Sequence, residues 1–206
     1  MLGDNVLAGP TRHEVIDTVE IAGRRVGSDE PSFVVAEIGI NHNGDIDLVR
    51  KLISAAVTAG CDAVKFQKRT VDVVYSREEL ERPRESPYGT TNGDLKRGLE
   101  LDHDAFSAID EYCGMLGIAW FSSCWDQASV DILEQFDPPC YKIASASLTD
   151  DGLLRHHRQY GRPIILSTGM SELAEIDHAV EVLGVDDLVL LHATSTYPSQ
   201  PAELNL

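Results

Sequence analysis

Short apolar strands alternate with amphipathic helices from residue 33 onward, and this alternation constrains the fold more than any other feature of the chain. From the third predicted strand on, the strands begin 22 to 25 residues apart. Strands that recur with a helix between them form parallel βαβ units, so the sequence predicts an α/β protein with one parallel sheet. The six predicted strands are FVVAEIG (33–39), AVKFQ (63–67), IAWFSS (118–123), CYKIAS (140–145), PIILST (163–168) and LVLLHAT (188–194).

Two segments stand outside this alternation. Residues 1–32 predict a loose tail over 1–13 and a small hairpin over VEIAGRRVG (19–27), because that stretch alternates around a central Ala-Gly. Residues 68–101 are polar, include RPRESPYGTTNGD and have weak periodicity. We expect a long loop there, and a long loop inside a compact domain is usually functional or mobile.

The composition narrows the classes of partner. The 206 residues provide one sizeable core, and 34 acidic against 17 basic residues give a net charge of -17. Such a surface repels phosphate backbones and anionic lipid, so nucleic-acid and membrane partners are not expected. No apolar run approaches the roughly 18 residues of a membrane helix, and no signal peptide is visible. Four cysteines without CxxC spacing predict reduced thiols, and the expected location is cytoplasmic.

Polar side chains gather where the predicted strands end. The carboxyl ends of parallel strands meet at one edge of a sheet, which is where parallel α/β folds place their ligand sites. We therefore expect one polar rim above an apolar core. Its members are Glu37; Lys65 and Gln67; Ser122 and Ser123; Lys142 and Ser145; Ser167 and Thr168; and His192, Thr194 and Ser195.

Lys65 and Lys142 lie inside predicted strands, where lysine is almost never buried without a partner. One interpretation is that each simply pairs with a carboxylate such as Glu37. A second is an anion site, because two ammonium groups beside several hydroxyls complement phosphate or carboxylate. A third is a lysine that forms a Schiff base. The presence of both lysines on one rim favours the anion site.

Three histidine positions carry weaker hypotheses. His192 lies on an apolar strand, and a hydrogen-bonded rim residue is favoured over a metal ligand. His42, between two asparagines, fits a turn or a ligand contact equally well. His156 and His157 are expected at the surface of a helix.

Five motifs resemble the sialic acid synthase family, which makes N-acetylneuraminate and the related legionaminate, pseudaminate and spore-coat sugars. They are AEIGINHNGD (36–45), AVKFQ (63–67), YKIAS (141–145), PIILSTGM (163–170) and LLHATSTYP (190–198), in the family's order and spacing. The resemblance implies a (β/α)8 TIM barrel, of which residues 33–206 would supply strands one to six. It also implies a C-terminal antifreeze-like domain, which is absent from this sequence.

The resemblance implies a transferase reaction in which phosphoenolpyruvate condenses with an N-acylated amino sugar such as N-acetylmannosamine. The products would be phosphate and a nine-carbon 2-keto sugar acid. A divalent metal, Mn2+ or Mg2+, would be the cofactor of the complete enzyme, which would be a homodimer. The family's two metal-binding histidines lie on strands beyond residue 206, so no metal ligand is expected in this chain.

The resemblance also assigns roles to individual residues. Glu37, Lys65 and Lys142 would form the catalytic group, with both lysines on the phosphate and carboxylate of phosphoenolpyruvate and Glu37 handling a proton or orienting water. The substrate-binding set would be Gln67 and Tyr197 on the acceptor sugar, with Ser123, Ser145, Ser167 and Ser195 supplying polar contacts. The chain departs from the family at Ser123-Cys124-Trp125, where Thr-Pro-Phe is usual, and at Ala193, where cysteine is usual.

Three functions are consistent with these residues. The first is the synthase, of which this chain alone is expected to be an incomplete and inactive part. The second is a truncated or degenerate barrel that binds an anion without catalysis. The third is a Schiff-base aldolase that uses Lys65 or Lys142.

Overall fold

A six-stranded parallel sheet organises residues 18–204, the part of the chain that the computed structural model describes. The strands lie side by side in chain order, which is the order of a barrel sheet and not of a doubly wound one, so the predicted order is confirmed. They are β3 (Val35–Gly39), β4 (Ala63–Lys68), β7 (Ala119–Cys124), β8 (Tyr141–Ile143), β9 (Ile164–Ser167) and β10 (Leu188–Leu191).

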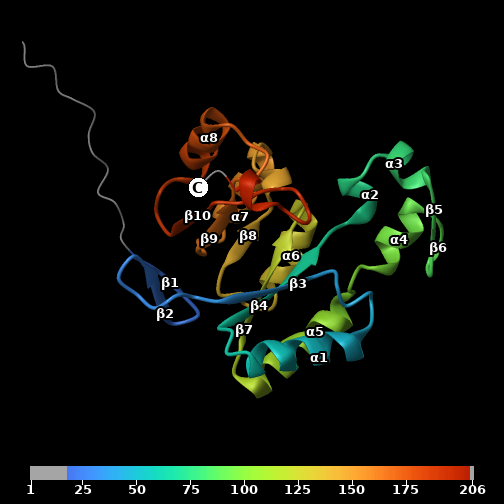
Figure 1. The fold of residues 1–206 in the computed structure, drawn as a ribbon, viewed down its shortest axis with the longest axis horizontal. Helices are drawn as coiled ribbons and strands as arrows, with labels where there is room; N and C mark the ends of the chain where they lie inside the picture. The colour runs from blue at the N-terminus through green and yellow to red at the C-terminus, as the bar shows by residue number, and fades with distance from the viewer. Residues whose placement is uncertain (1–17, 205–206) are drawn as a thin grey trace, which may run out of the picture.

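Helices cover the outer face of this sheet (Figure 1). The helices of this layer are α1 (Ile46–Thr58), α5 (His103–Leu116), α6 (Gln127–Glu134), α7 (Asp151–Arg158) and α8 (Leu173–Leu183). Helix α1 buries Val49, Ile53 and Ala56, a spacing that puts three apolar residues on one helical face. They pack in one cluster with Phe66 and Trp120, which point outward from β4 and β7.

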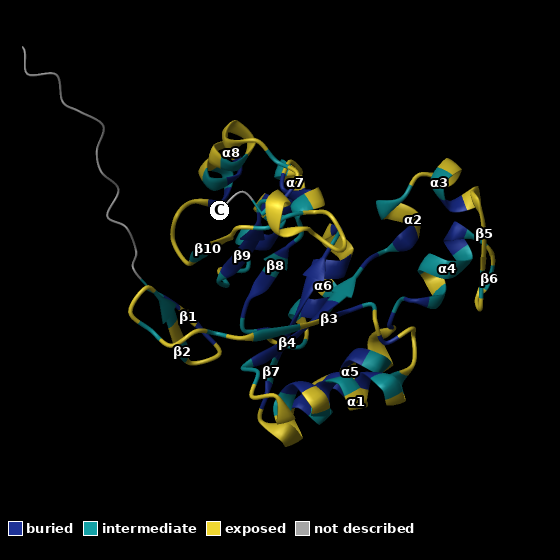
Figure 2. Ribbon diagram, viewed as in Figure 1, coloured by how far each residue is buried: buried dark blue, intermediate teal, exposed yellow. Residues whose placement is uncertain are grey.

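The sheet curls, because inner-face residues from both of its edge strands meet in one place. Val35 on β3 and Val189 on β10 pack in the same apolar cluster as Phe121 and Ile165 from the strands between them. A flat sheet would hold the two edge strands too far apart for this contact. The architecture is therefore an α/β half-barrel with a concave inner face, and the strands β4, β7 and β9 within the sheet are coloured mostly as buried in Figure 2.

The hairpin predicted over 19–27 forms, as β1 (Thr18–Ile21) and β2 (Arg24–Gly27). Val19 and Ile21 are buried in the inner-face cluster, so the hairpin closes the amino-terminal end of the half-barrel. The tail expected at residues 1–13 lies outside the described residues.

The long loop expected over 68–101 is wrong. This segment contains α2 (Val71–Val74), α3 (Arg77–Glu81), β5 (Pro83–Ser86), β6 (Gly89–Thr91) and α4 (Asn92–Gly98), which lie together at one side of the molecule (Figure 1). These elements are too short to show a periodic apolar pattern. Two of them begin at side-chain caps instead: Ser76, before α3, accepts from the Glu79 N–H, and Thr91, before α4, forms a capping box with Asp94.

Two smaller predictions also fail. The strand predicted over 140–145 ends at Ile143, and a 3-10 helix, η1 (Ser145–Ser147), follows it. His157 is not at the surface: it is fully buried, its ring packs edge-on against Tyr141, and burial lowers its pKa to about 4. A second 3-10 helix, η2 (Pro201–Glu203), lies near the end of the described chain.

The cysteines agree with the expected reduced state, since all four are free and three of them are buried. Burial raises the pKa of Cys113 and of Cys140 to about 12, which leaves both thiols protonated and unreactive near neutral pH.

Among residues 18–204, no helix has the length and apolar character needed to cross a membrane.

Candidate functional site

Glu37 and Lys65 form an ion pair on the concave inner face. Lys65 Nζ lies 2.6 Å from Glu37 Oε2 and donates to Ser123 Oγ at 3.3 Å. The pairing follows from topology, because Glu37 and Lys65 are direct neighbours in the β3–β4 register. Lys65 is only 3% exposed, whereas the Glu37 side chain is 59% exposed. The pair therefore runs from the floor of the concave face to the solvent at its mouth.

Lys142 is the second cation of this face. Burial and, to a smaller extent, the charge of Lys65 lower its pKa from the ordinary 10.5 to about 8, while the charge of Glu37 opposes both effects. All three groups are thus close enough to interact electrostatically. Lys142 forms no ion pair with a carboxylate in the described part of the chain, unlike Lys65. An anion at this mouth would give Lys142 the partner that the protein does not supply.

An apolar cavity of about 220 Å³ lies beneath these charges, and we call it the inner cavity. Phe121, Ile165 and Val189 form its walls, while Glu37 and Lys142 lie at its polar end. Because the walls are apolar, the charge of Lys142 interacts more strongly with its neighbours here than it would in bulk solvent.

Ser123 and Ser167 add hydroxyl groups to the inner face. Phe121 on β7 and Ile165 on β9 face inward, and Ser123 and Ser167 lie two residues further along the same strands. Because side chains alternate between the two faces of a strand, both serines also face inward. Ser123 is also the register neighbour of Lys142. Both serines are buried, with 1% and 6% exposure, so their hydroxyls are confined to this face.

Gln67 lies at the end of β4 beside the backbone of Gly39. A methyl group built on Gly39 would lie 3.5 Å from Gln67 Nε2. The register between β3 and β4 shifts between Glu37 and Gly39, which is a β-bulge at Ile38. Bulges redirect side chains next to binding sites, and this one brings Gln67 next to the end of β3.

Ser145 and Ser195 meet above β9, at Gly169. A methyl group on Gly169 would lie 2.6 Å from Ser195 Oγ and 3.0 Å from Ser145 Oγ. Alternation along an extended strand would send Ser145 to the face opposite Lys142. The strand ends first, and η1 turns Ser145 toward the strand ends instead. These two hydroxyls form a second polar group at the same end of the sheet.

Tyr197, His42 and His192 stand apart from these groups. Tyr197 is 95% exposed, so the described structure does not bring it to the ionic centre. His42 is buried and its Nδ1 accepts from the Gly44 N–H at 3.0 Å, which is the turn role; burial lowers its pKa. His192 Nε2 is hydrogen-bonded to the Leu204 carbonyl at 2.6 Å, so it is a hydrogen-bonded rim residue as predicted.

Two buried networks beside the site were not predicted. Arg69 donates from Nε to Glu100 at 2.6 Å and from Nη1 to the Tyr75 hydroxyl at 2.9 Å. Asp126 accepts from the N–H and hydroxyl groups of both Thr70 and Ser129. The sequence signal for the second network is the spacing of Asp126 and Ser129, in which a helix N-cap is followed three residues later by a polar side chain.

The described residues do not form a divalent-metal site. Between residues 18 and 204, no three His, Cys, Asp or Glu side chains gather closely enough to hold an ion. Glu37 is paired with Lys65, and His192 Nε2 is bonded to a carbonyl. No chemical step is therefore assigned to a metal.

Comparison with known proteins gives consistent results. Residues 52–206 match the NeuB family. The chain is 40% identical to an uncharacterised protein of Methanocaldococcus jannaschii over 93% of its own length and 54% of that protein. It is 35% identical to the N-acetylneuraminate-9-phosphate synthase of Mus musculus, over 89% and 52% of the two chains. It thus spans about half the length of these relatives.

The fold is also that of a solved structure. The N-acetylneuraminic acid (sialic acid) synthetase of Leptospira borgpetersenii, in complex with citrate, superposes with a TM-score of 0.81 over 91% of this chain and 63% of that one, at 24% identity. At this identity the likeness concerns the fold alone. The five motifs, the family match and the identity to a synthase agree, and the chain is a member of the NeuB, or sialic acid synthase, family.

Proposed function

We propose that the inner face binds phosphoenolpyruvate for condensation with an N-acylated amino sugar, giving phosphate and a nine-carbon 2-keto sugar acid. The observation that carries this proposal is the placement of Lys142 and Glu37 at the polar end of an apolar cavity, with the buried Lys65 paired to Glu37. Burial and the charge of Lys65 lower the pKa of Lys142, and the two lysines share one carboxylate, Glu37, so the site is short of one negative charge. Phosphoenolpyruvate carries a phosphate and a carboxylate, and it supplies that charge.

Each residue has a role in this reaction. Lys65 and Lys142 hold the phosphate and carboxylate, and Ser123 donates a hydroxyl to the same oxygens. The enol carbon of phosphoenolpyruvate forms a bond to the aldehyde carbon of the sugar, and the aldehyde oxygen takes up a proton. Water then adds to C2, and C–O cleavage releases phosphate and leaves the 2-keto group. Glu37, exposed at the mouth, accepts the proton of that water.

Phosphorus NMR of phosphoenolpyruvate with the 206-residue chain tests the anion site. We expect line broadening at millimolar ligand, which is lost in Lys142→Met and Lys65→Met. Lys51→Met is the matched control, because Lys51 is exposed on the far side of α1 from the sheet. Equal broadening in all four proteins would overturn the site, and so would none in the parent chain.

Phosphate release from phosphoenolpyruvate tests the reaction. In the complete protein, phosphate release should require N-acetylmannosamine. The assay is run with and without Mn2+ or Mg2+. The isolated chain should bind without turnover, because a half-barrel leaves the cavity open at the edges of β3 and β10. Binding without release in every form of the protein would instead favour an anion-binding module. A cytoplasmic homodimer is the proposed working form.

The lowered pKa of Lys142 also keeps a Schiff-base aldolase as a second candidate, since a neutral amine is the nucleophile in that chemistry. Treatment with pyruvate and borohydride separates the two functions. A covalent adduct on Lys142 by mass spectrometry would favour the aldolase; an unmodified chain agrees with the synthase.

A further inference from the structure

Lys142 is a nucleophile that the ion pairs of the inner face leave free. It has no carboxylate partner in the described part of the chain, whereas Lys65 is paired with Glu37 at 2.6 Å. Burial and, to a smaller extent, the charge of Lys65 lower the pKa of Lys142 to about 8, so a substantial fraction of this side chain is a neutral amine just above neutral pH. A neutral amine can attack an electrophile, and an ammonium ion cannot.

The inner cavity selects the electrophile that can reach this amine. The cavity holds about 220 Å³, and apart from Glu37 and Lys142 the side chains that line it are apolar, among them Phe121, Ile165 and Val189. Carbon dioxide is a small linear molecule with no net charge and no hydrogen-bond donor, so apolar walls accommodate it without desolvating a charge. Bicarbonate would have to lose its hydration shell in the same space, which is unfavourable.

The electrostatic field at Lys142 favours a negative charge over a positive one. Two neighbouring charges act on this side chain, and the ammonium of Lys65 has a larger effect on it than the carboxylate of Glu37. Lys65 is buried and Glu37 is largely exposed, so solvent screens the carboxylate more than the ammonium. The field that disfavours an ammonium on Lys142 would therefore stabilise an anion attached to its amine.

Ser123 offers a hydroxyl donor beside the same amine. It is the register neighbour of Lys142 and is buried on the inner face. Its Oγ accepts from Lys65 Nζ at 3.3 Å, and the described structure gives its own O–H no acceptor. An anionic oxygen attached to Lys142 would supply that acceptor, and a hydrogen bond to a charged acceptor is stronger than one between neutral groups.

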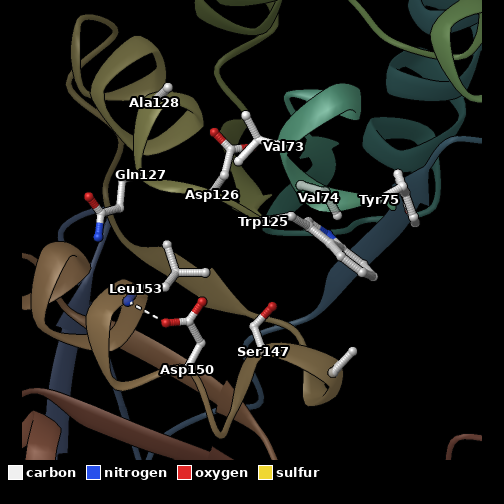
Figure 3. A pocket seen from close by; sticks show the side chains of 11 residues that line it. Val73, Val74, Tyr75, Trp125, Asp126, Gln127, Ala128, Ser147, Asp150 and Leu153 are labelled. Atoms are coloured by element: carbon white, nitrogen blue, oxygen red, sulfur yellow. Dashed lines mark hydrogen bonds between the residues drawn. The ribbon is translucent and has the colours of Figure 1, made fainter. Parts of the chain in front are cut away.

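A second pocket, of about 570 Å³, does not offer this chemistry (Figure 3). It shares no lining residue with the inner cavity, and none of the described residues that line it is a lysine, a histidine or a cysteine. Trp125, Ser147 and Asp150 are among its residues, and Figure 3 shows Asp150 hydrogen-bonded to the backbone of Leu153. Amine chemistry is therefore assigned to the inner cavity.

We propose that the Lys142 amine reversibly binds carbon dioxide as a carbamate. The nitrogen lone pair forms a bond to the carbon of carbon dioxide, one C=O electron pair moves onto oxygen, and the nitrogen releases one proton to solvent past the exposed Glu37. The carbamate accepts a hydrogen bond from Ser123 and faces the Lys65 ammonium. Carbamylation removes the positive charge of Lys142, so it would oppose anion binding at the mouth. It depends on the amine and the cavity, and not on the phosphoenolpyruvate proposal.

Carbon-13 NMR of the 206-residue chain with labelled bicarbonate, which equilibrates with carbon dioxide, tests this proposal. We expect a carbamate resonance above the Lys142 pKa of about 8 that is lost below it. The α-amino group of a chain forms the same adduct, because its pKa is also near 8. Triethyloxonium converts carbamates into stable esters, and peptide mass spectrometry of the treated parent chain should therefore find an ester on Lys142.

Variants test the contacts of the carbamate. Lys142→Arg keeps a cation without a nucleophilic amine and should remove the resonance. Ser123→Ala should lower the carbamate content about tenfold, the effect of one hydrogen bond to a charged acceptor. Lys51→Arg and Ser107→Ala, at exposed positions on α1 and α5, are the matched controls and should leave the resonance unchanged. Urea unfolding shows whether each variant is folded.

Three results would overturn the proposal. The first is trapping of esters on other amines of the parent chain with none on Lys142, a result that depends on no variant. The second is a set of carbamate resonances in Lys142→Arg identical to that of the parent chain. The third is equal carbamate content in the parent chain and in folded Ser123→Ala.

Discussion

At the scale of single residues, the inner face is built at the expense of stability. Lys142 is held where burial and a neighbouring ammonium disfavour its charge, and Lys65 depends on one exposed carboxylate. Sequence reasoning identified both lysines and Glu37, because a charge inside an apolar strand is a strong signal. It did not identify Trp125 or Ser147 as pocket residues, because an aromatic residue and a serine after a strand carry no such signal.

Lys142→Met should stabilise the chain by roughly 1–3 kcal/mol at pH 7. The folded pKa of about 8 lies below the ordinary 10.5, so the unfolded chain binds more protons between these values. The destabilising effect of Lys142 is therefore complete below pH 8 and disappears as pH rises toward 10.5. Urea unfolding across this pH range measures it, with Lys51→Met as the control. A stability difference that does not shrink at high pH would contradict the assignment.

Glu37→Gln should have opposite effects on binding and on stability. Removing one negative charge from the mouth should tighten phosphate binding severalfold, while loss of the Lys65 partner should lower the free energy of unfolding by about 1 kcal/mol, since Glu37 is largely exposed. Phosphorus NMR and urea unfolding measure the two effects. Glu181→Gln, on the exposed side of α8, controls for net charge. Weaker phosphate binding in Glu37→Gln would show that the carboxylate does not repel the anion.

At the scale of elements, the segment from α2 to α4 is fixed to the loop after β3 by two glycines. Gly44 has φ +68, and a methyl group there would lie 2.3 Å from the Gly98 carbonyl oxygen. A methyl group on Gly98 would lie 2.2 Å from the Tyr88 ring, whose hydroxyl donates to the Asn43 carbonyl. Strand order was predictable from the alternation of strands and helices. This docking was not, because it depends on contacts between residues 45 or more positions apart.

Gly44→Ala should destabilise the chain by more than about 1–2 kcal/mol, because the left-handed backbone and the contact with Gly98 both oppose a side chain. Gly114→Ala is the matched control. It lies inside α5 with nothing within 4 Å of an added methyl group, so it should stabilise the chain by about 0.5–1 kcal/mol. Thermal unfolding of the two variants gives the comparison. Similar changes in both would show that the docking does not constrain the β3 loop.

At the scale of the whole molecule, the half-barrel has two outer strands, β3 and β10. Within residues 18–204, each pairs with a neighbour on one side only. Val34 and Leu190, at or beside these edges, are each 48% exposed. Open apolar edges invite pairing with another chain. The sequence predicted β3 and β10 as the outer strands of the described sheet, because the alternation of strands and helices places the six strands in chain order.

The 206-residue chain should therefore self-associate, and Val34→Lys together with Leu190→Lys should reduce the association, because charged edges resist strand pairing. Sedimentation velocity at several concentrations measures this. Val73→Lys, at a 69% exposed position on α2 away from both edges, is the control and should have no effect. A monomeric parent chain would contradict the prediction.

The hairpin β1–β2 has a consequence for the order of events at the inner cavity. Ile21 and Val26 of the hairpin line one end of the cavity, so a ligand that enters along the strand direction approaches from the opposite end, past Glu37 and Lys142. A compound that reaches the lysines must arrive before any partner bound above it, and must depart after that partner. Steady-state kinetics of the complete protein should accordingly follow a compulsory sequence, with the phosphorylated substrate first on and its phosphate last off.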